Sequence, residues 1–320
     1  MTSEYSGTGD ASTEKKEKPW LSIVGIGEDG LEGLGRNAIK AIEAAEVVFG
    51  GKRHLELAAE AILGEARRWP VPFDTDMGDV VALRGKRVCV LASGDPFFYG
   101  VGVTLLRRIE AGETVSYPSP SAFSLAAARL GWALQSVECV SLHGRSIDLL
   151  RPYLHAGARI IALTSDAHAP ALIAELLSDL GFGQSEFILL EALGGERERR
   201  RQVRAADFTF ADIDPLNVVA IDVMANEGAR VLPFTAGFDD SLFEHDGQIT
   251  KREIRAVTIS SLAPRRGELL WDIGAGSGSI GIEWMLSHPS LRAIALNNTR
   301  KGRNVSLAMP KLSVCRGLRS

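Results

Sequence analysis

Residues 87–100 read Arg-Val-Cys-Val-Leu-Ala-Ser-Gly-Asp-Pro-Phe-Phe-Tyr-Gly. The apolar run up to Ala92 predicts a buried strand, which ends at Ser93-Gly94-Asp95-Pro96. Here Gly94 allows a close backbone approach to a ligand, and Asp95 can accept hydrogen bonds. Open α/β sheets bind ligands at the edge where their strands end. The alternative is a helix N-terminus, with Asp95 as its cap and Pro96 in its first turn.

Strand-like and helix-like segments alternate on both sides of this stretch. Short apolar runs predict strands, and apolar residues at helical spacing or alanine-rich runs predict helices. The predicted strands are 20–25, 87–92, 158–163, 187–191 and 217–223, and the predicted helices are 36–48, 101–109, 121–130 and 170–180. The alternation predicts an α/β protein with largely parallel sheets. Residues 20–225 are long enough for two such lobes.

The composition is that of a soluble protein with about two domains at 320 residues. A net charge of −4 gives no reason to expect nucleic-acid binding. Residues 1–18 are polar and predict a disordered tail, not a signal peptide. No apolar stretch reaches about 18 residues, so a membrane span is not expected. Three widely spaced cysteines, with no Cys/His cluster, favour the cytoplasm and no metal site.

The first predicted strand ends in a glycine loop, Gly25-Ile26-Gly27-Glu28-Asp29-Gly30. The loop matches the GxGxxG pattern, which in dinucleotide sites opens a helix and is followed by an acidic residue about 20 positions later. In this chain the helix begins near Arg36, and Phe49-Gly50-Gly51 follows instead of an acid. An NAD(P)-dependent α/β oxidoreductase is therefore an alternative function, and a tight turn without a ligand is another reading of the loop.

Several of these segments together resemble the tetrapyrrole methylase family. The segments that carry the resemblance, in order over residues 20–225, are 24–30, 93–100, 118–123 and 127–132. Two more, 141–145 and 163–166, are similar to the branch that methylates C5 of a corrin precursor in cobalamin biosynthesis. The resemblance implies two α/β lobes with S-adenosylmethionine (SAM) bound in the cleft between them. It also implies a tetrapyrrole substrate and a homo-oligomer.

The resemblance implies cofactor-binding residues position by position. They are Gly27, Glu28, Ser93, Gly94, Asp95, Phe98, Ser121, Ala122 and Thr164. SAM carries an activated methyl group, so the protein mainly has to hold the two reactants in line. No catalytic base is identified. We expect His143 and Arg145 to bind substrate carboxylates, because arginine suits bidentate carboxylate binding; a structural loop role for His143 is the alternative. The charged run Glu196–Arg204 predicts a solvated helix face or, less favoured, a basic rim facing substrate.

A second glycine loop, Asp272-Ile273-Gly274-Ala275-Gly276-Ser277-Gly278, follows the apolar strand Leu269–Ile273. It resembles the first motif of class I, Rossmann-like SAM methyltransferases. With residues 246–256 it resembles a domain that methylates C15 of the corrin precursor and decarboxylates an acetate side chain. The cofactor contacts that this resemblance implies are Thr250, Asp272, Gly274, Gly276 and Gly278. Physically, a helix N-terminus favours the methionine carboxylate; a glycine turn without a ligand is the alternative.

The chain departs from that pattern in the next predicted strand, residues 291–296. The strand ends in Asn297-Asn298, where an acidic residue should hold the ribose hydroxyls, and the periodic pattern is lost from Asn297. After Glu283 there are seven Lys or Arg residues and no Asp or Glu. We therefore expect a complete domain at 19–225, a linker at 226–237 and an incomplete class I domain at 238–320. C5 methylation should survive, while C15 methylation and decarboxylation should be lost. A non-catalytic corrinoid-binding protein is a further alternative.

Overall fold

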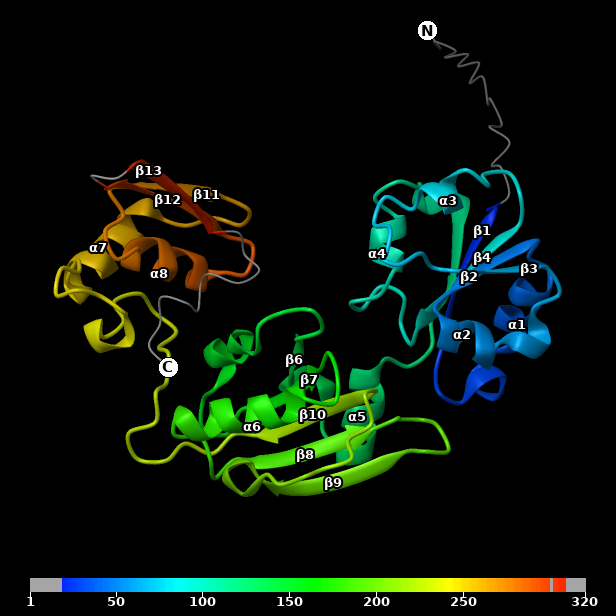
Figure 1. Ribbon diagram of the computed structural model, residues 1–320, viewed down its shortest axis with the longest axis horizontal. Coiled ribbons are helices and arrows are strands. Elements are labelled where there is room, and N and C mark those ends of the chain that lie inside the picture. The colour runs from blue at the N-terminus through cyan, green and yellow to red at the C-terminus, as the bar shows by residue number, and fades with distance from the viewer. Residues whose placement is uncertain (1–18, 300–301, 309–320) are drawn as a thin grey trace, which may run out of the picture. The chain divides into compact units, whose positions relative to one another are not determined.

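The computed structural model describes residues 19–299 and 302–308 of the chain, so the predicted tail lies outside the described residues. Figure 1 shows strands and helices in three groups along the chain. The chain divides into two compact units, residues 1–121 and 122–320. The second unit holds one sheet at residues 138–222 and another at residues 269–308.

The first unit contains a five-stranded parallel sheet in the order β3-β2-β4-β1-β5. Its strands are β1 (Leu21–Ile26), β2 (Val47–Gly50), β3 (Glu65–Arg68), β4 (Val88–Ser93) and β5 (Thr114–Tyr117). Its helices are α1 (Arg36–Glu43), α2 (Lys52–Leu57), α3 (Gly78–Val81) and α4 (Gly102–Leu105). The central strands β1 and β4 are buried on both faces, which explains their continuous apolar sequences.

Two predicted helices of the first unit are shorter than expected. The helix expected over residues 36–48 ends at Glu43, and Val47–Gly50 form the buried strand β2 instead. The β-branched and aromatic side chains of Val47, Val48 and Phe49 suit a strand that is packed on both faces. The helix expected over residues 101–109 is limited to Gly102–Leu105.

The second unit begins with α5 (Ala122–Leu130), which covers a sheet in the order β6-β7-β10-β8-β9. These strands are β6 (Glu138–Ser141), β7 (Arg159–Leu163), β8 (Glu186–Glu191), β9 (Arg199–Arg204) and β10 (Asn217–Asp222). The other helix, α6 (Ala169–Asp179), packs into the core on the sheet's opposite face. The expectation of a largely parallel sheet is wrong here, because β6 and β7 are parallel but β10 runs antiparallel to β7 and β8.

The charged run Glu196–Arg204 is not a helix face, because its second part forms the edge strand β9. Alternate residues of a strand point to the same side, so Arg199 and Arg201 share one face. Both arginines reach the fully buried carboxylate of Glu191 on β8, at 2.7 and 3.0 Å. The backbone N–H of Asp214 also donates to Glu191, at 2.9 Å. Two of these arginines therefore neutralise one buried acid.

The last group of elements comprises α7 (Arg252–Leu262), α8 (Ser279–Ser287), β11 (Leu269–Ile273), β12 (Arg292–Thr299) and β13 (Gly302–Ala308). The strand order is β11-β12-β13, with β11 parallel and β13 antiparallel to β12. The expectation that no strand pattern follows Asn297 is wrong, because residues 302–308 form β13. Three apolar side chains of β11 are exposed: Leu269 by 38%, Trp271 by 60% and Ile273 by 79%.

A fully buried arginine joins α7, α8 and the segment that precedes them. Arg255 donates to Glu283 at 2.7 Å and to Asp240 at 2.7 Å, and it also bonds the carbonyl oxygens of Phe238 and Thr250. The buried carboxylate of Glu283 in turn accepts the backbone N–H groups of Gly237 and Phe238. Every charged atom of this pair therefore has a partner, as a buried ion pair requires.

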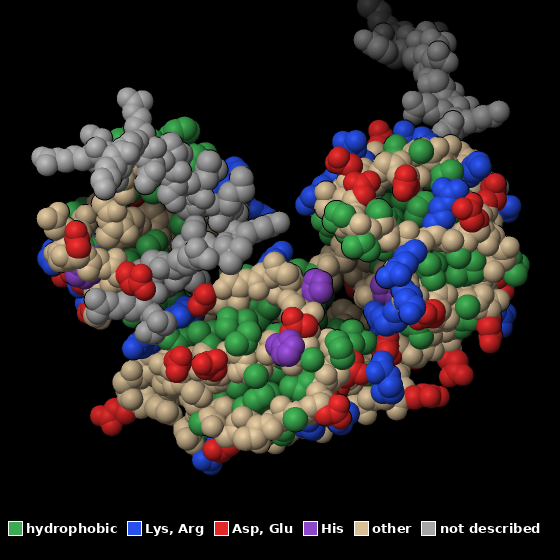
Figure 2. Space-filling view, in the orientation of Figure 1, with side chains coloured by type: hydrophobic (Ala, Val, Ile, Leu, Met, Phe, Trp, Pro, Cys, Tyr) green, Lys and Arg blue, Asp and Glu red, His purple; other side chains and the backbone are tan. Residues whose placement is uncertain are grey.

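Short 3-10 helices connect these elements at Gly30–Gly33, Ala59–Ala61, Ala111–Glu113, Leu134–Ser136, Ile147–Tyr153, Ala205–Asp207 and Asp240–Leu242. On the face that Figure 2 shows, acidic and basic side chains are interspersed. Among the described residues, none of the helices combines the length and the apolar character that crossing a membrane requires.

Candidate functional site

The first candidate site forms where β1 and β4 end side by side. The two strands are paired up to Ile26 and Ser93, so the loops Gly27–Gly30 and Gly94–Gly100 leave the sheet together. The N–H of Gly94 donates to the carbonyl oxygen of Ile26 at 3.2 Å, which fixes one loop on the other. The structure thus brings the predicted cofactor residues Gly27, Glu28, Ser93, Gly94 and Asp95 to one edge of the sheet.

Three chain segments meet at Gly25 and Gly94 with no room for a side chain. A Cβ atom at Gly25 would lie 1.7 Å from the carbonyl oxygen of Gly94 and 2.9 Å from the nitrogen of Ser119. In addition, Gly94 has φ +53°, in the left-handed region that glycine tolerates best. The segment after β5 is bonded to both loops, because Ser119 donates its N–H to Gly94 and its hydroxyl to Gly25. Glycine at these positions is a steric requirement.

The loop after Ser93 is a turn, not the start of a helix. Asp95 accepts the N–H of Phe97 at 2.8 Å through its side chain and the N–H of Phe98 at 3.2 Å through its backbone. The next helix begins only at Gly102, so Asp95 is not the cap of a helix and that alternative is wrong. Phe98 is 39% exposed, and Tyr99 has φ +58°. A non-glycine residue in that region marks local strain, which is common at ligand sites.

Two residues that sequence reasoning missed complete this edge: Arg53 and His54 of α2. Arg53 forms an ion pair with Glu28, whose side chain is only 10% exposed, and donates to Ser93 Oγ at 3.1 Å. His54 Nε2 lies 3.0 Å from Arg53 Nη2 and 2.8 Å from Ser93 Oγ. His54 Nδ1 is buried and has no hydrogen-bond partner among the described residues. The two predicted cofactor positions Glu28 and Ser93 are therefore joined through α2.

Burial, with the positive charge of Arg53, lowers the pKa of His54 from 6.5 to about 4. Between these two values the unfolded chain takes up a proton at His54 that the folded chain does not, so the free energy of unfolding falls as pH falls from 6.5 to 4. We expect His54→Gln to reduce this loss by up to about 3 kcal/mol. Urea unfolding at pH 7 and pH 4.5 checks it, with the exposed His288→Gln as control. Equal acid sensitivity in His54→Gln and the wild type would contradict the buried, neutral imidazole.

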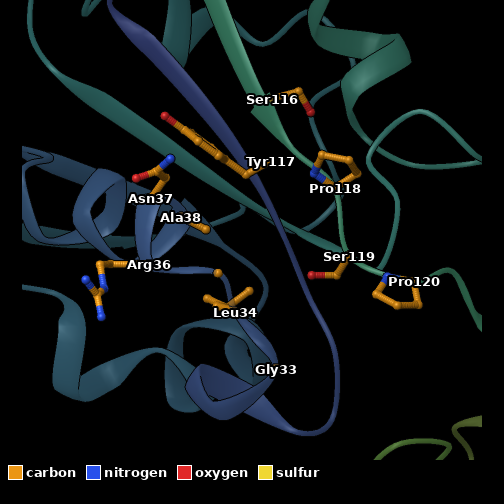
Figure 3. A pocket seen from close by; sticks show the side chains of 11 residues that line it. Gly33, Leu34, Arg36, Asn37, Ala38, Ser116, Tyr117, Pro118, Ser119 and Pro120 are labelled. Atoms are coloured by element: carbon orange, nitrogen blue, oxygen red, sulfur yellow. The ribbon is translucent and has the colours of Figure 1, made fainter.

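A cavity of about 390 Å³ lies beside this edge, between the start of α1 and the end of β5. Figure 3 shows Leu34 and Asn37 on one side, Pro118 and Pro120 on the other, and the side chain of Tyr117 reaching toward Asn37. The lining also includes Ser116, whose buried hydroxyl oxygen lacks a partner among the described residues. Ser119 belongs both to this lining and to the contact with Gly25 and Gly94, so the cavity adjoins the candidate cofactor loops.

The site residues predicted after the first lobe lie at the ends of other elements. Ser121 is 7% exposed and immediately precedes α5, whose first residue is Ala122. Thr164 follows β7 and is also 7% exposed. Its hydroxyl donates to Asn217, at 2.6 Å from the side-chain oxygen and 2.8 Å from the backbone oxygen. The Thr164 side chain therefore ties β7 to β10. Its contact with the cofactor stays a prediction.

The structure brings His143 next to Thr164, because both follow the parallel strands β6 and β7. His143 Nδ1 lies 3.3 Å from the carbonyl oxygen of Thr164. The intervening loop is held by Ser165, whose hydroxyl accepts the N–H of Gly144 and donates to the carbonyl oxygen of Leu142. Both His143 and Arg145 are exposed.

The late glycine loop forms a second candidate site at the end of β11. Gly274, Gly276 and Gly278 all have positive φ, and a Cβ atom at any of them would meet nothing within 4 Å. Glycine is thus needed for backbone conformation and not for space. Burial raises the pKa of the Asp272 carboxyl, partly offset by the N–H of Gly281, and its Oδ2 has no partner among the described residues. Thr250 is exposed, and its carbonyl oxygen is bonded to Arg255.

Asn297 binds the late loop itself. Its side-chain oxygen accepts the N–H of Gly276 at 2.9 Å, and its side-chain nitrogen donates to the carbonyl oxygen of Gly276 at 3.1 Å. This is the position at which we expected an acidic residue to hold ribose hydroxyls. A carboxylate could accept the first bond but could not donate the second, so the amide holds the loop in a way that an acid cannot.

Two families match the sequence in consecutive parts. Residues 21–209 match the family described as Tetrapyrrole (Corrin/Porphyrin) Methylases, and residues 241–316 match the Precorrin methyltransferase domain. The second match extends beyond Asn297. The first match includes the loops at the ends of β1 and β4, and the second includes the late glycine loop.

Individual relatives agree with these matches. A Sinorhizobium sp. protein called precorrin-6Y C(5,15)-methyltransferase [decarboxylating] is 58% identical over 93% of this chain and 74% of its own length. A Salmonella typhimurium protein called cobalt-precorrin-7 C(5)-methyltransferase is 32% identical over 56% of this chain and 88% of its own length. The structure of uroporphyrin-III C-methyl transferase from Thermus thermophilus, complexed with S-adenosylhomocysteine, superposes with a TM-score of 0.51 at 21% identity. The superposition covers 63% of this chain and 91% of that one.

Proposed function

The chain belongs to the tetrapyrrole methylases, in the family of precorrin-6Y C5,15-methyltransferases (decarboxylating), and from this premise we propose that it methylates C5 through the edge where β1 and β4 end. It is a SAM-dependent methyltransferase of cobalamin biosynthesis. The observation that carries the C5 assignment is the junction of Gly25, Gly94 and Ser119. There, three loops of the tetrapyrrole methylase part are fixed without room for side chains.

The residues at this edge fit SAM. The cofactor supplies an activated methyl group on a sulfonium, and its ammonium, ribose hydroxyls and adenine amino group are hydrogen-bond donors. The exposed oxygen of Ser93, the carboxylate of Asp95 and the backbone around Gly94 provide acceptors. Phe98 adds an exposed aromatic face. These groups hold and orient the cofactor, which is a positioning task that needs no base among the described residues.

We propose that the substrate's carboxylates are bound by the loop after β6. Arg145 offers a planar pair of donors, which matches a carboxylate better than a lysine would. His143 lies in the same loop, and its bond to the backbone of Thr164 leaves Nε2 available to a second partner. Both residues are exposed.

We further propose one working SAM site in this chain, at the first edge and not at the late loop. Class I sites hold the ribose through an acidic residue at the end of the second strand. Here that position is Asn297, whose amide is bonded in both directions to Gly276. The antiparallel β13 that follows is another departure from a parallel βαβ arrangement. Both observations support C5 methylation without C15 methylation or decarboxylation.

Product analysis tests this assignment. We expect the purified chain, incubated with precorrin-6Y and SAM, to add one methyl group at C5 and to release no CO2. Calorimetric titration should give one SAM per chain. Release of CO2 with a second methyl group at C15, or two SAM per chain, would contradict the single-site proposal. Tight NAD(P)H binding without SAM binding would favour the oxidoreductase alternative, and corrinoid binding without methylation would favour a carrier.

Three further expectations belong to the same proposal. The substrate is a small tetrapyrrole and not a nucleic acid, the chain acts in the cytoplasm, and it forms a homo-oligomer. Mixed charge on the visible surface supports the first of these (Figure 2). Sedimentation of the purified chain measures the last.

A further inference from the structure

The hydrogen bonds around Ser93 assign a role to two residues of α2, on the premise of the cofactor site proposed above. We infer that Arg53 and His54 are positioning residues: together they orient the Ser93 hydroxyl so that it presents an acceptor, and not a donor, to SAM. Neither residue was among the site residues expected from the sequence, and both belong to the six-residue helix α2.

The contact between Arg53 and His54 points to one tautomer of the imidazole. A guanidinium can only donate, so the 3.0 Å contact with Arg53 Nη2 is a hydrogen bond only if His54 Nε2 accepts without a proton. The neutral ring then carries its proton on the buried Nδ1. Burial and the charge of Arg53 both disfavour the doubly protonated ring, so His54 is neutral at neutral pH and its single proton stays on Nδ1.

The tautomer in turn decides the direction of the Ser93 hydroxyl. With Nε2 unprotonated, Ser93 Oγ at 2.8 Å donates its hydrogen to His54, so that the single lone pair of Nε2 is shared between Ser93 and Arg53. The same oxygen accepts a hydrogen bond from Arg53 Nη2 at 3.1 Å. A hydroxyl has one hydrogen and two acceptor sites, so one acceptor site on Ser93 Oγ is left for a ligand. The available group is a lone pair, which matches the donor groups of SAM.

Glu28 anchors this arrangement from the first glycine loop. Its nearly buried carboxylate forms an ion pair with Arg53 Nη1, on the other arm of the guanidinium from the one that reaches Ser93. Glu28 therefore acts on the cofactor through Arg53. The sheet order makes this possible, because β2 lies next to β4 and the residues that follow β2 reach the last residue of β4.

Replacing His54 in two ways separates orientation from packing. His54→Leu fills the space but removes the acceptor, whereas His54→Gln offers a carbonyl oxygen near the place of Nε2. We expect His54→Leu to raise the dissociation constant of SAM about tenfold, and His54→Gln to restore it to within about threefold of wild type. Arg53→Lys keeps the charge but loses the two-armed contact, and we expect a several-fold increase. The exposed Arg108→Lys serves as the matched control.

Nitrogen NMR of the imidazole gives a readout that packing alone does not move. In the wild-type chain we expect His54 to show a protonated Nδ1 and an unprotonated Nε2, and in Arg53→Lys a mixture of tautomers. Wild-type SAM affinity in His54→Leu, or a protonated Nε2 in the wild type, would overturn the inference. The variant Ser93→Ala distinguishes failure of this inference from failure of the proposed cofactor site. If Ser93→Ala binds SAM like the wild type, Ser93 is not in the cofactor site and the inference fails. Gly94→Ala then still tests the proposed cofactor site itself.

Discussion

Gly25→Ala is expected to abolish SAM binding, with an affinity loss of at least about 100-fold, or about 2.7 kcal/mol. Its Cβ atom would lie 1.7 Å from the carbonyl oxygen of Gly94, a distance that no side-chain rotation can relieve. The two loops would have to separate, which displaces Ser93 and Asp95 together. Isothermal titration with SAM measures the effect, and far-ultraviolet circular dichroism shows whether the sheet still forms.

Gly94→Ala is a second variant of the junction between Gly25, Gly94 and Ser119, and Gly112→Ala is its control. Alanine at Gly94 would approach the carbonyl oxygen of Pro120 to 2.9 Å and would have to adopt φ +53°, so we expect a smaller loss with the fold retained. At Gly112 a Cβ atom meets nothing within 4 Å, and no change in affinity is expected. Wild-type SAM affinity in a folded Gly94→Ala variant would place the cofactor elsewhere.

Arg255→Met is expected to destabilise the part of the chain built on α7, α8 and β11 by about 3–5 kcal/mol, because it leaves the buried carboxylate of Glu283 without its charged partner. The guanidinium bonds groups from three chain segments, and its loss also frees the carbonyl oxygen of Phe238. Hydrogen exchange measured by mass spectrometry should show rapid exchange in α8 of the variant, whereas Trp284 of this helix is buried in the wild-type chain. Loss of so much stability is expected to unfold this small domain.

The exposed Arg266→Met is the control for Arg255→Met and should leave exchange in α8 unchanged. Because the proposed cofactor site lies within residues 21–209, SAM affinity should persist in Arg255→Met. If α8 stays protected, the buried pair is not what holds these helices together. If SAM binding disappears along with α8, the cofactor site depends on the late loop and the single-site assignment is wrong.

The strands that sequence reasoning found are those with a local apolar run. The strands β1, β4, β7, β10 and β11 are such runs, and their predicted limits lie within one residue of the observed ones. By contrast, β3 and β9 are short edge strands made largely of charged residues. Their pairing depends on residues of a neighbouring strand, such as Glu191 of β8, which binds Arg199 and Arg201 of β9. A pattern within one segment does not contain that information.

The candidate site residues likewise divide into those that a local sequence pattern indicates and those that depend on strand order. Ser93, Gly94 and Asp95 were predicted as site residues from a strand end followed by a glycine turn, which is a local signal, and from the family resemblance. Arg53 and His54 were missed although they follow the noted Gly50-Gly51, because their importance arises from the placement of β2 beside β4. The resemblance predicted that Thr164 contacts the cofactor, and the hydrogen bonds of its hydroxyl to Asn217 could not be seen before β7 and β10 were paired.

The uncovered face of β11 has a consequence for handling the protein. Among the described residues this strand lies at the edge of its sheet, and Leu269, Trp271 and Ile273 form a row of exposed apolar side chains along it. Such an edge is a template for pairing with another polypeptide and a source of aggregation. We therefore expect this strand to limit the concentration at which the protein stays in solution. The variant Ile273→Lys should raise that concentration while leaving methyl transfer unchanged.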